Sequence, residues 1–244
     1  MFNFLKRRSN IQQLFYHTDV HCHILPGVDH GSPDIETSLM LIEKEMEMGI
    51  NKIVTTSHVT DGVAENSPAT LRPAFEKLKA AVKAKGLQVE LALSAEYRID
   101  DLFLSQLENK ELLPYPNDYL LVENSFQQEL LGFDDLMFNL QLKGFSPILA
   151  HPERYSYYNH DRYRHLHDSG VLFQANVLSF TGYYGGRAYA TAMWMLQNDL
   201  IDFLGSDIHN ENHARLLAEF TSTKEYKKIE AKLKDRLLND TAFI

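Results

Sequence analysis

The chain has 244 residues, of which 44% are hydrophobic and 23% are charged, and these values favour no disordered, fibrous or membrane class. The formal net charge of -9 argues against nucleic acid as a partner, because affinity for a polyanion is built mainly from lysines and arginines. The single cysteine, Cys22, excludes an intramolecular disulfide, and residues 1–10 lack the pattern of a signal peptide. No apolar run approaches the roughly 18 residues of a membrane span. We therefore expect a cytoplasmic protein without stable membrane insertion.

Short apolar runs alternate with helical segments along the chain. In chain order, strands are predicted at 18–20, 53–55, 89–95, 119–122, 147–150, 171–175 and 201–204. Helices are expected from Ser32 to Gly49 and from Ser67 to Gly86, because each segment opens with a cap residue and a proline and closes at a glycine. Further helix ends are expected at Gly144 and Gly170. This order predicts an α/β protein with a parallel sheet, and about seven units predict a distorted (β/α)7 TIM-like barrel.

The domain organisation is predicted to be simple. No linker, low-complexity tract or internal repeat divides the chain, so residues 1–244 are expected to form one domain. Residues 1–16 are expected to be a short N-terminal extension. Residues 222–238 are expected to form an amphipathic helix on the exterior.

Polar residues that need an explanation follow directly after these apolar runs. They are His21, His23, His58, Glu96, Glu123, His151, Asp207 and His209. In a parallel barrel the carboxyl ends of the strands share one face, and catalytic groups converge there. The positions of these residues therefore indicate a functional site.

The residue types indicate a metal centre. Imidazole nitrogens and carboxylate oxygens suit zinc, manganese or iron, and a carboxylate such as Glu96 can bridge two ions. Residues two apart in a strand point to the same side, so His21 and His23 present a pair of ligands, as do Asp207 and His209. Taken singly, each residue is also compatible with a hydrogen-bonded core position. Burying all of them without cations would be costly, and this favours the metal interpretation.

Several motifs carry a resemblance to a known family. The sequence resembles the polymerase-and-histidinol-phosphatase (PHP) family at Asp19-Val20-His21-Cys22-His23, Thr56-Ser57-His58, Ala95-Glu96, His151-Pro152-Glu153-Arg154 and Ser206-Asp207-Ile208-His209. Within it, residues 23–29 and 151–154 resemble the bacterial protein-tyrosine phosphatases of capsule and exopolysaccharide operons. The resemblance runs from about Asp19 to His209, and it implies the PHP fold.

The resemblance also implies roles for these residues. It implies that one ion is held by His21, His23, Glu96 and Asp207, a second by Glu96, Glu123 and His151, and a third by His58, His209 and one residue of the first loop. The family usually has an aspartate at that last position, where this sequence has His30. His30 is therefore expected either to ligate the third ion or to face solvent. Two or three divalent ions per chain are implied, manganese first, with iron or zinc as alternatives.

Catalysis is expected to use a water activated by the ions, which attacks phosphorus in line, while Arg154 grips the phosphate. His209 is placed among both the ligands and the catalytic residues. Arg215, with His213, is expected either to act on the leaving group or phosphate or to lie on a surface helix. Cys22 points to the opposite strand face and is not expected to be a nucleophile.

Two aromatic segments are compatible with a wall for a tyrosyl ring, although ordinary loop packing is the alternative. They contain Tyr155, Tyr157 and Tyr158 in one loop and Tyr183 and Tyr184 in another.

The leading functional hypothesis is a metal-dependent protein-tyrosine phosphatase. Its expected substrate is phosphotyrosine in the tail of a bacterial tyrosine autokinase that regulates capsular or exopolysaccharide synthesis. One alternative is a small-molecule phosphatase of the histidinol-phosphate type, and another is a noncatalytic regulatory barrel with a degenerate metal site. The sequence leaves the oligomeric state open.

Overall fold

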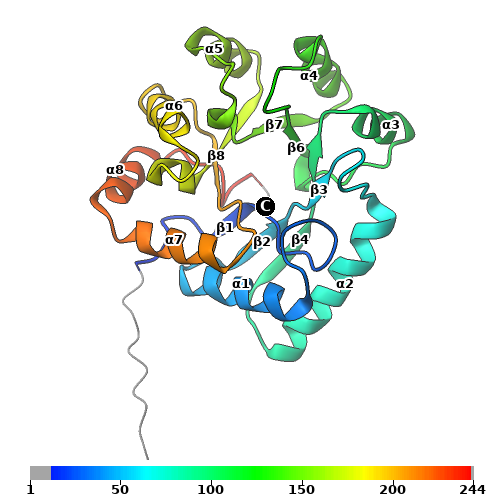
Figure 1. Cartoon of the computed structure of the whole chain (residues 1–244), viewed down its shortest axis with the longest axis vertical. Helices are drawn as coiled ribbons and strands as arrows, with labels where there is room; N and C mark the ends of the chain where they lie inside the picture. The colour runs from blue at the N-terminus through cyan, green and yellow to red at the C-terminus, as the bar shows by residue number, and fades with distance from the viewer. Residues whose placement is uncertain (1–11, 243–244) are drawn as a thin grey trace, which may run out of the picture.

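The computed structural model describes residues 12–242 and shows a ring of helices around a curled parallel sheet (Figure 1). The strands are β1 (Thr18–Cys22), β2 (Lys52–Thr55), β3 (His58–Val59), β4 (Glu90–Leu93), β5 (Glu96–Arg98), β6 (Tyr119–Glu123), β7 (Ser146–Ala150), β8 (Leu172–Asn176) and β9 (Phe203–Gly205). The helices are α1 (Ile35–Glu47), α2 (Pro68–Lys85), α3 (Asp101–Asn109), α4 (Phe133–Leu142), α5 (His160–Asp168), α6 (Gly186–Gln197), α7 (Glu211–Thr221) and α8 (Lys224–Leu233). Three short 3-10 turns, Pro116–Asp118, Pro152–Arg154 and Val177–Thr181, lie in the connections.

The described strands occupy seven positions around the barrel. They pair in parallel in the orders β1-β2-β4 and β3-β5-β6-β7-β8-β9. β2 continues into β3 and β4 into β5 after breaks of two residues, so each pair acts as one kinked strand. The ring closes between β9 and β1, where the amide of Asp207 donates to His21 O (2.7 Å) and that of His23 to Ile208 O (2.9 Å). The prediction of a distorted seven-unit parallel barrel is confirmed.

The predicted strand over residues 89–95 is the one that differs most from the structure. Only β4 lies within this range; it ends at Leu93, and β5 begins at Glu96 after a break at Ser94 and Ala95, where the Ser94 hydroxyl donates to Leu113 O (2.9 Å). Because of this kink, β5 pairs with β6 and carries Glu96 toward the mouth of the barrel.

The first two helices begin and end close to the predicted residues. The Asp34 side chain caps α1 by accepting from Thr37 N (2.8 Å), and Pro68 opens α2 after Ser67. Gly86 ends α2 in the left-handed region at φ 75°, which favours glycine.

The predicted helix over 222–238 is shorter in the structure. Thr223 caps α8 by accepting from Tyr226 N (3.1 Å), and the helix ends at Leu233. The chain then turns under the barrel, where the amide of Leu238 donates to Asp202 O (2.9 Å), and it reaches the middle of the ring in Figure 1. This pairing and packing below the barrel account for the early end of the helix.

Two apolar cores support the site. The larger core lies between the strands and the helices, and it includes Leu14 and Tyr16, so the expected extension 1–16 contributes core side chains at its end. Residues 1–11 of that extension lie outside the described part of the chain. The smaller core takes side chains such as Val20, Val54 and Ile148 from the strands and is joined by Ala242. It forms the base of the barrel beneath the polar mouth.

Strand β1 contains an irregularity that affects the site. Its pairing with β2 shifts by one residue between Asp19 and Cys22, which is a β-bulge. Asp19 and Cys22 therefore both lie near Glu45 of α1. Cys22 is fully buried in the larger core, on the face opposite to His21 and His23.

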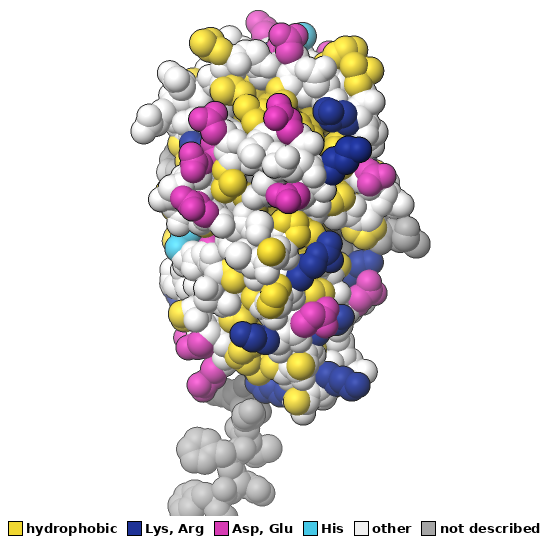
Figure 2. Space-filling view, turned by 90° about the vertical axis from the view of Figure 1, so that its right-hand side faces the viewer, with side chains coloured by type: hydrophobic (Ala, Val, Ile, Leu, Met, Phe, Trp, Pro, Cys, Tyr) yellow, Lys and Arg dark blue, Asp and Glu magenta, His cyan; other side chains and the backbone are white. Residues whose placement is uncertain are grey.

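The surface over α2 and α3 carries hydrophobic, acidic and basic side chains side by side, as Figure 2 shows. This face therefore has no broad basic area of the kind that a nucleic-acid backbone requires. No helix within residues 12–242 is long and apolar enough to cross a membrane.

Candidate metal centre

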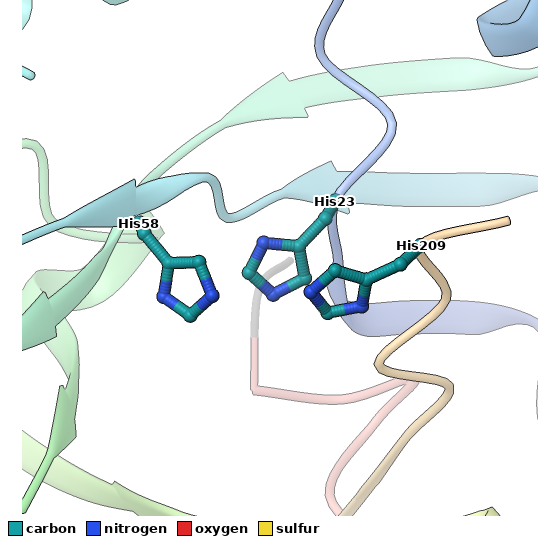
Figure 3. A group of neighbouring side chains, drawn as sticks. All are labelled: His23, His58 and His209. Carbon is teal, nitrogen blue, oxygen red and sulfur yellow. The ribbon is translucent and has the colours of Figure 1, made fainter. Parts of the chain in front are cut away.

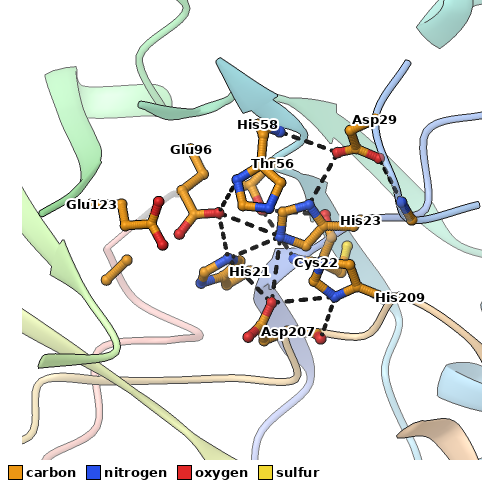
Figure 4. A network of polar contacts seen from close by, with 12 residues as sticks. His21, Cys22, His23, Asp29, Thr56, His58, Glu96, Glu123, Asp207 and His209 are labelled. Carbon is orange, nitrogen blue, oxygen red and sulfur yellow. Dashed lines mark hydrogen bonds and ion pairs between the residues drawn. The ribbon is translucent and has the colours of Figure 1, made fainter. Parts of the chain in front are cut away.

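The predicted ligands converge at the carboxyl ends of the strands (Figure 4). His21 and His23 come from the end of β1, His58 from β3, Glu96 from β5, Glu123 from β6, His151 from the residue after β7, and Asp207 and His209 from the segment after β9. Most of them are buried, whereas His58 and His209 are partly exposed and His30 is exposed. The structure therefore brings together the side chains that the sequence placed at one face.

His21 and His23 are oriented by hydrogen bonds on the far sides of their rings. His21 Nδ1 donates to Gln174 Oε1 (2.6 Å), and His23 Nδ1 donates to Asp29 Oδ2 (3.0 Å). Each Nδ1 therefore carries the proton in the neutral ring, and each Nε2 keeps a lone pair. These two Nε2 atoms face one another at only 3.2 Å.

Two carboxylates surround the same point. Glu96 Oε2 lies 3.4 Å from Nε2 of both His21 and His23, and Asp207 Oδ1 lies 3.7 and 3.4 Å from these atoms. Glu96 Oε2 is buried and has His58 Nδ1 at 2.9 Å, but it makes no well-directed hydrogen bond with any described residue. Lone pairs directed at one point repel each other unless a cation lies between them, so this donor set fits a divalent metal ion.

A second group lies on the other side of Glu96. His151 Nε2 is 3.0 Å from Glu96 Oε1 and 3.6 Å from Glu123 Oε1. Burial and the nearby charge of Arg154 lower the pKa of His151 to about 4, so its imidazole is neutral near pH 7, as a ligand must be. Burial and the charge of Glu96 raise the pKa of Glu123 to about 7, although Arg98 pairs with this carboxylate at 3.2 Å. A bound cation would favour the ionised form of Glu123.

A third group consists of His23, His58 and His209, whose ligating nitrogens lie within 4.8 Å of one another (Figure 3). Burial and the charge of His23 lower the pKa of His209 to about 3, which keeps this ring neutral. The ring of His30 lies 4.8 Å from that of His58 and 4.6 Å from that of His209. His30 is thus exposed to solvent and also placed beside the third group.

The protonation balance of the cluster also fits cation binding. Although burial opposes charge on His23, its hydrogen bonds to Asp207 and Asp29 raise its pKa well above the ordinary value. Burial also opposes charge on Asp207 and by itself would raise its pKa. The charges of the neighbouring imidazoles nevertheless hold this pKa well below normal. Protons thus supply the positive charge that the carboxylates require, and metal ions would replace these protons.

Two of the converging residues have an unusual backbone conformation. His151 and Asp207 both have positive φ, at 33° and 50°, one and two residues after the ends of their strands. Such conformations cost on the order of 1–3 kcal/mol in non-glycine residues and persist where the surroundings enforce them. Here they turn both side chains toward the barrel axis.

The loop after β1 approaches the site closely at Gly31. A side chain at this position would overlap the carbonyl oxygen of His23, so only glycine fits. The Gly31 amide donates to Asp29 Oδ1 (2.9 Å), and the His58 amide donates to Asp29 Oδ2 (3.1 Å). Asp29 therefore joins the loop to both His23 and His58.

A pocket of about 480 Å³ opens above the cluster. It is lined by His30, His58, Thr60, Val63, Glu123, Phe126, His151, Arg154, Tyr183, Tyr184, Asp207, His209, Asn210 and His213. Arg154 Nη1 lies 3.3 Å from Asp207 Oδ2, and the guanidinium lies between the rings of Phe126 and Tyr184, 4.6 and 4.3 Å from their centroids. Aromatic contacts of this kind use the flat side of a guanidinium and leave the donors at its edge for an anion.

The structure separates the two α7 residues that the sequence grouped together. His213 lines the pocket, where its Nε2 is hydrogen bonded to Tyr183 Oη (2.9 Å). Arg215 instead lies on the exposed side of α7, where it bonds to Glu219 (2.6 Å) and Asn212 (2.8 Å). The surface-helix interpretation therefore applies to Arg215, because two residues further along a helix its side chain faces away from the pocket.

The tyrosines also divide into two groups. Tyr155 and Tyr158 are buried, and Tyr155, Tyr157 and Tyr158 hydrogen bond to residues 124 and 125, so they pack a loop. Tyr183 and Tyr184 line the pocket. The interpretation as ordinary loop packing therefore applies to the segment with Tyr155, Tyr157 and Tyr158. Tyr183 and Tyr184 form part of the wall of a cleft.

Several contributing residues did not stand out in the sequence. Gln174 and Asn176 alternate along β8, and Asn176 Nδ2 donates to Asp207 Oδ2 (2.6 Å). Gln174 lies in the predicted strand over 171–175 and Asn176 one residue beyond it, and their spacing of two residues was an available signal. Phe126 lies in a loop beyond β6, and its position had no signal in the sequence.

Comparison with known proteins agrees with this geometry. A family model described as "Capsular polysaccharide synthesis, CpsB/CapC" matches residues 17–242. Tyrosine-protein phosphatase YwqE of Bacillus subtilis is 33% identical over 79% of this chain and 77% of its own length. Tyrosine-protein phosphatase CpsB of Streptococcus pneumoniae is 31% identical over 79% of this chain and 82% of its own length. Putative tyrosine-protein phosphatase CapC of Staphylococcus aureus is 28% identical over 91% of this chain and 88% of its own length.

Solved structures show the same fold. A crystal structure from the study of YwqE and CpsB, described as unique metal-dependent tyrosine phosphatases, superposes with a TM-score of 0.76 at 29% identity, covering 93% of this chain and 96% of that one. An amidohydrolase from Mycoplasma synoviae shares the fold alone, with a TM-score of 0.59 at 14% identity, covering 92% of this chain and 86% of that one. Since the family model spans nearly the whole described chain and the fold agrees, this chain belongs to the CpsB/CapC family of capsular polysaccharide synthesis.

Proposed function

We propose that this chain is a metal-dependent phosphoric monoester hydrolase that removes phosphate from phosphotyrosine in proteins. The observation that carries this proposal is the cage of imidazole and carboxylate lone pairs beside Arg154, at the base of a pocket with aromatic walls. The names of the related tyrosine phosphatases from three bacteria support the substrate class.

The metal centre is proposed to hold two or three divalent ions, with manganese first and iron or zinc as alternatives. His21, His23, Glu96 and Asp207 would hold one, Glu96, Glu123 and His151 a second, and His30, His58 and His209 a third. When bound, the ions would supply Lewis acidity, which activates water and offsets the negative charge of the phosphate.

The residues of the chain itself bind and orient the phosphate. Arg154 is fixed by Asp207 on one side and by two aromatic rings on its faces, so its remaining donors are preorganised toward the pocket. Gln174 and Asp29 hold the two β1 histidines in the tautomer that leaves Nε2 free. Tyr183 and His213 line the pocket wall, where Tyr183 Oη is hydrogen bonded to His213 Nε2 (2.9 Å), and they contribute hydrogen-bonding capacity there.

The proposed protein substrate is a phosphotyrosine segment of a bacterial tyrosine kinase, in the cytoplasm. The family's assignment to capsular polysaccharide synthesis supports a kinase that regulates this process. We propose neither nucleic acid nor a membrane as partner, in keeping with the net charge of -9.

The test is hydrolysis of a phosphotyrosine peptide and of histidinol phosphate by the manganese-loaded chain, before and after chelation. We expect faster turnover of the peptide, loss on chelation, and loss of at least about 100-fold in His21→Ala and His151→Ala. Faster turnover of histidinol phosphate would favour the small-molecule phosphatase. Less than one ion per chain together with no hydrolysis would favour a noncatalytic barrel.

A further inference from the structure

Phe126 is a large aromatic side chain that remains exposed at the mouth of the pocket. It lies in the loop between β6 and α4, it is 39% exposed, and it lines the pocket. An exposed phenyl ring at the edge of a pocket offers apolar surface to a bound ligand.

The loop that carries Phe126 is fixed on both sides of this residue. Before it, Tyr157 Oη donates to Ser125 O (2.5 Å) and the Asn124 amide donates to Tyr155 Oη (2.9 Å). After it, the Leu130 amide donates to Asn124 Oδ1 (3.3 Å). The ring is therefore held in place by its loop, although 39% of the residue is exposed.

The inner side of the Phe126 ring contacts the catalytic machinery. The ring centroid lies 4.6 Å from the Arg154 guanidinium carbon. It lies 5.6 Å from the His151 ring, with an angle of 23° between the planes. Phe126 thus stands beside the residue proposed to bind phosphate and beside a proposed metal ligand.

We propose that Phe126 determines specificity by stacking on the aromatic ring of the leaving group, so that the site prefers aryl to alkyl phosphate esters. This inference rests on the proposed phosphatase function. In an aryl phosphate a single oxygen atom joins phosphorus to the ring, so a phosphate held at Arg154 places the ring close to Phe126. An alkyl phosphate presents no flat face for the same contact.

The test measures binding of two ligands that are not hydrolysed and differ only in their organic group. Phenylphosphonate and methylphosphonate are titrated by calorimetry into the manganese-loaded full chain, its Phe126→Ala and Phe126→Leu variants, and the control Phe138→Ala. Phe138 is also exposed, at 59%, but lies on α4 and does not line the pocket. Thermal unfolding and metal content of each variant establish that it is folded and loaded.

We expect the wild type and Phe138→Ala to bind phenylphosphonate more tightly than methylphosphonate. In Phe126→Ala this preference should fall by about threefold to tenfold, with a smaller fall in Phe126→Leu, which keeps apolar contact but loses the flat ring. A role limited to supporting Arg154 would weaken both ligands equally, and that result would overturn the proposal. Absence of any preference in the wild type would overturn it as well.

The proposed function and the aryl site can fail separately. A wild type that prefers phenylphosphonate but does not hydrolyse a phosphotyrosine peptide would contradict the phosphatase proposal and support the aryl site. A wild type that hydrolyses the peptide but shows an unchanged preference in both Phe126 variants would contradict only the aryl site.

Discussion

Gln174 shows how a residue outside the ligand set controls the metal centre. Its Oε1 accepts from His21 Nδ1, and its Nε2 donates to Asn176 Oδ1 (2.9 Å), which in turn bonds to Asp207. We predict that Gln174→Leu weakens manganese binding by about 10-fold to 100-fold, because the His21 ring loses the partner that fixes its tautomer. Activity measured against manganese concentration checks this, with recovery expected at saturating metal. An unchanged activation midpoint would contradict it.

The proposed third ion is expected to depend on His30. Its ring lies beside His58 and His209, although it is exposed. We predict that His30→Ala binds about one manganese ion fewer per chain and that His30→Asp restores it, because carboxylate oxygen also suits manganese. Elemental analysis after dialysis against equal free manganese gives the count. The same metal content in all three proteins would show that His30 only faces solvent.

Strand periodicity and the motifs were sufficient to predict the ligand cluster, since residues at strand ends must meet in a parallel barrel. The prediction was less complete for residues that act through others. Asp29 lies on a loop, and nothing in its spacing indicates that it bonds to His23 and His58 at once. Arg215, by contrast, was grouped with the site but lies outside the pocket. Its proximity in sequence to Asp207 did not establish which face of α7 it occupies.

Helix α1 carries a buried carboxyl group that affects stability. Both oxygens of Glu45 are buried without a hydrogen-bond partner among the described residues, and burial together with Asp19 raises its pKa well above the ordinary value of 4.5. The folded state therefore keeps a proton that the unfolded chain releases, so the free energy of unfolding falls as pH rises above about 4.5.

We predict that Glu45→Met is more stable than the wild type by about 1–3 kcal/mol at neutral pH, because it removes an unsatisfied buried polar group. The gain should increase from about pH 5 to pH 8, where the wild type loses stability. Urea unfolding of the metal-loaded proteins at several pH values measures this difference. Glu45→Gln, which cannot ionise, serves as the matched control and should also lose the pH dependence. A gain that does not change with pH would contradict the assignment.

Apolar runs were sufficient to predict the order of the strands, and cap residues with closing glycines were sufficient to predict the first two helices. The apolar runs did not reveal the break between β4 and β5, because a continuous apolar run looks the same whether or not the strand kinks. The amphipathic pattern also predicted that the last helix continues to residue 238. Such a pattern cannot show that Leu238 instead joins the core under the barrel. Both differences arise from tertiary contacts that one segment of sequence does not contain.

The whole molecule separates stability from chemistry along the barrel axis. The lower half of the barrel is filled by apolar side chains from the strands and by Ala242, whereas the upper half holds the charged cluster. Closure of β9 onto β1 is reinforced by Asp19, which accepts from Ser206 N (3.0 Å) and from the Ser206 hydroxyl (2.5 Å). The rigid base thus holds ligands from distant parts of the chain at fixed distances.

We propose that cations bound by this cluster make the barrel a phosphoesterase. The most direct measurement is a manganese titration of the metal-free chain in which bound ions and phosphotyrosine hydrolysis are followed together. We predict that hydrolysis is absent at the start, rises with bound metal and reaches a plateau at about two or three ions per chain, while His21→Ala does not reach it. Full hydrolysis with less than one ion per chain, or an identical response in His21→Ala, would contradict the claim.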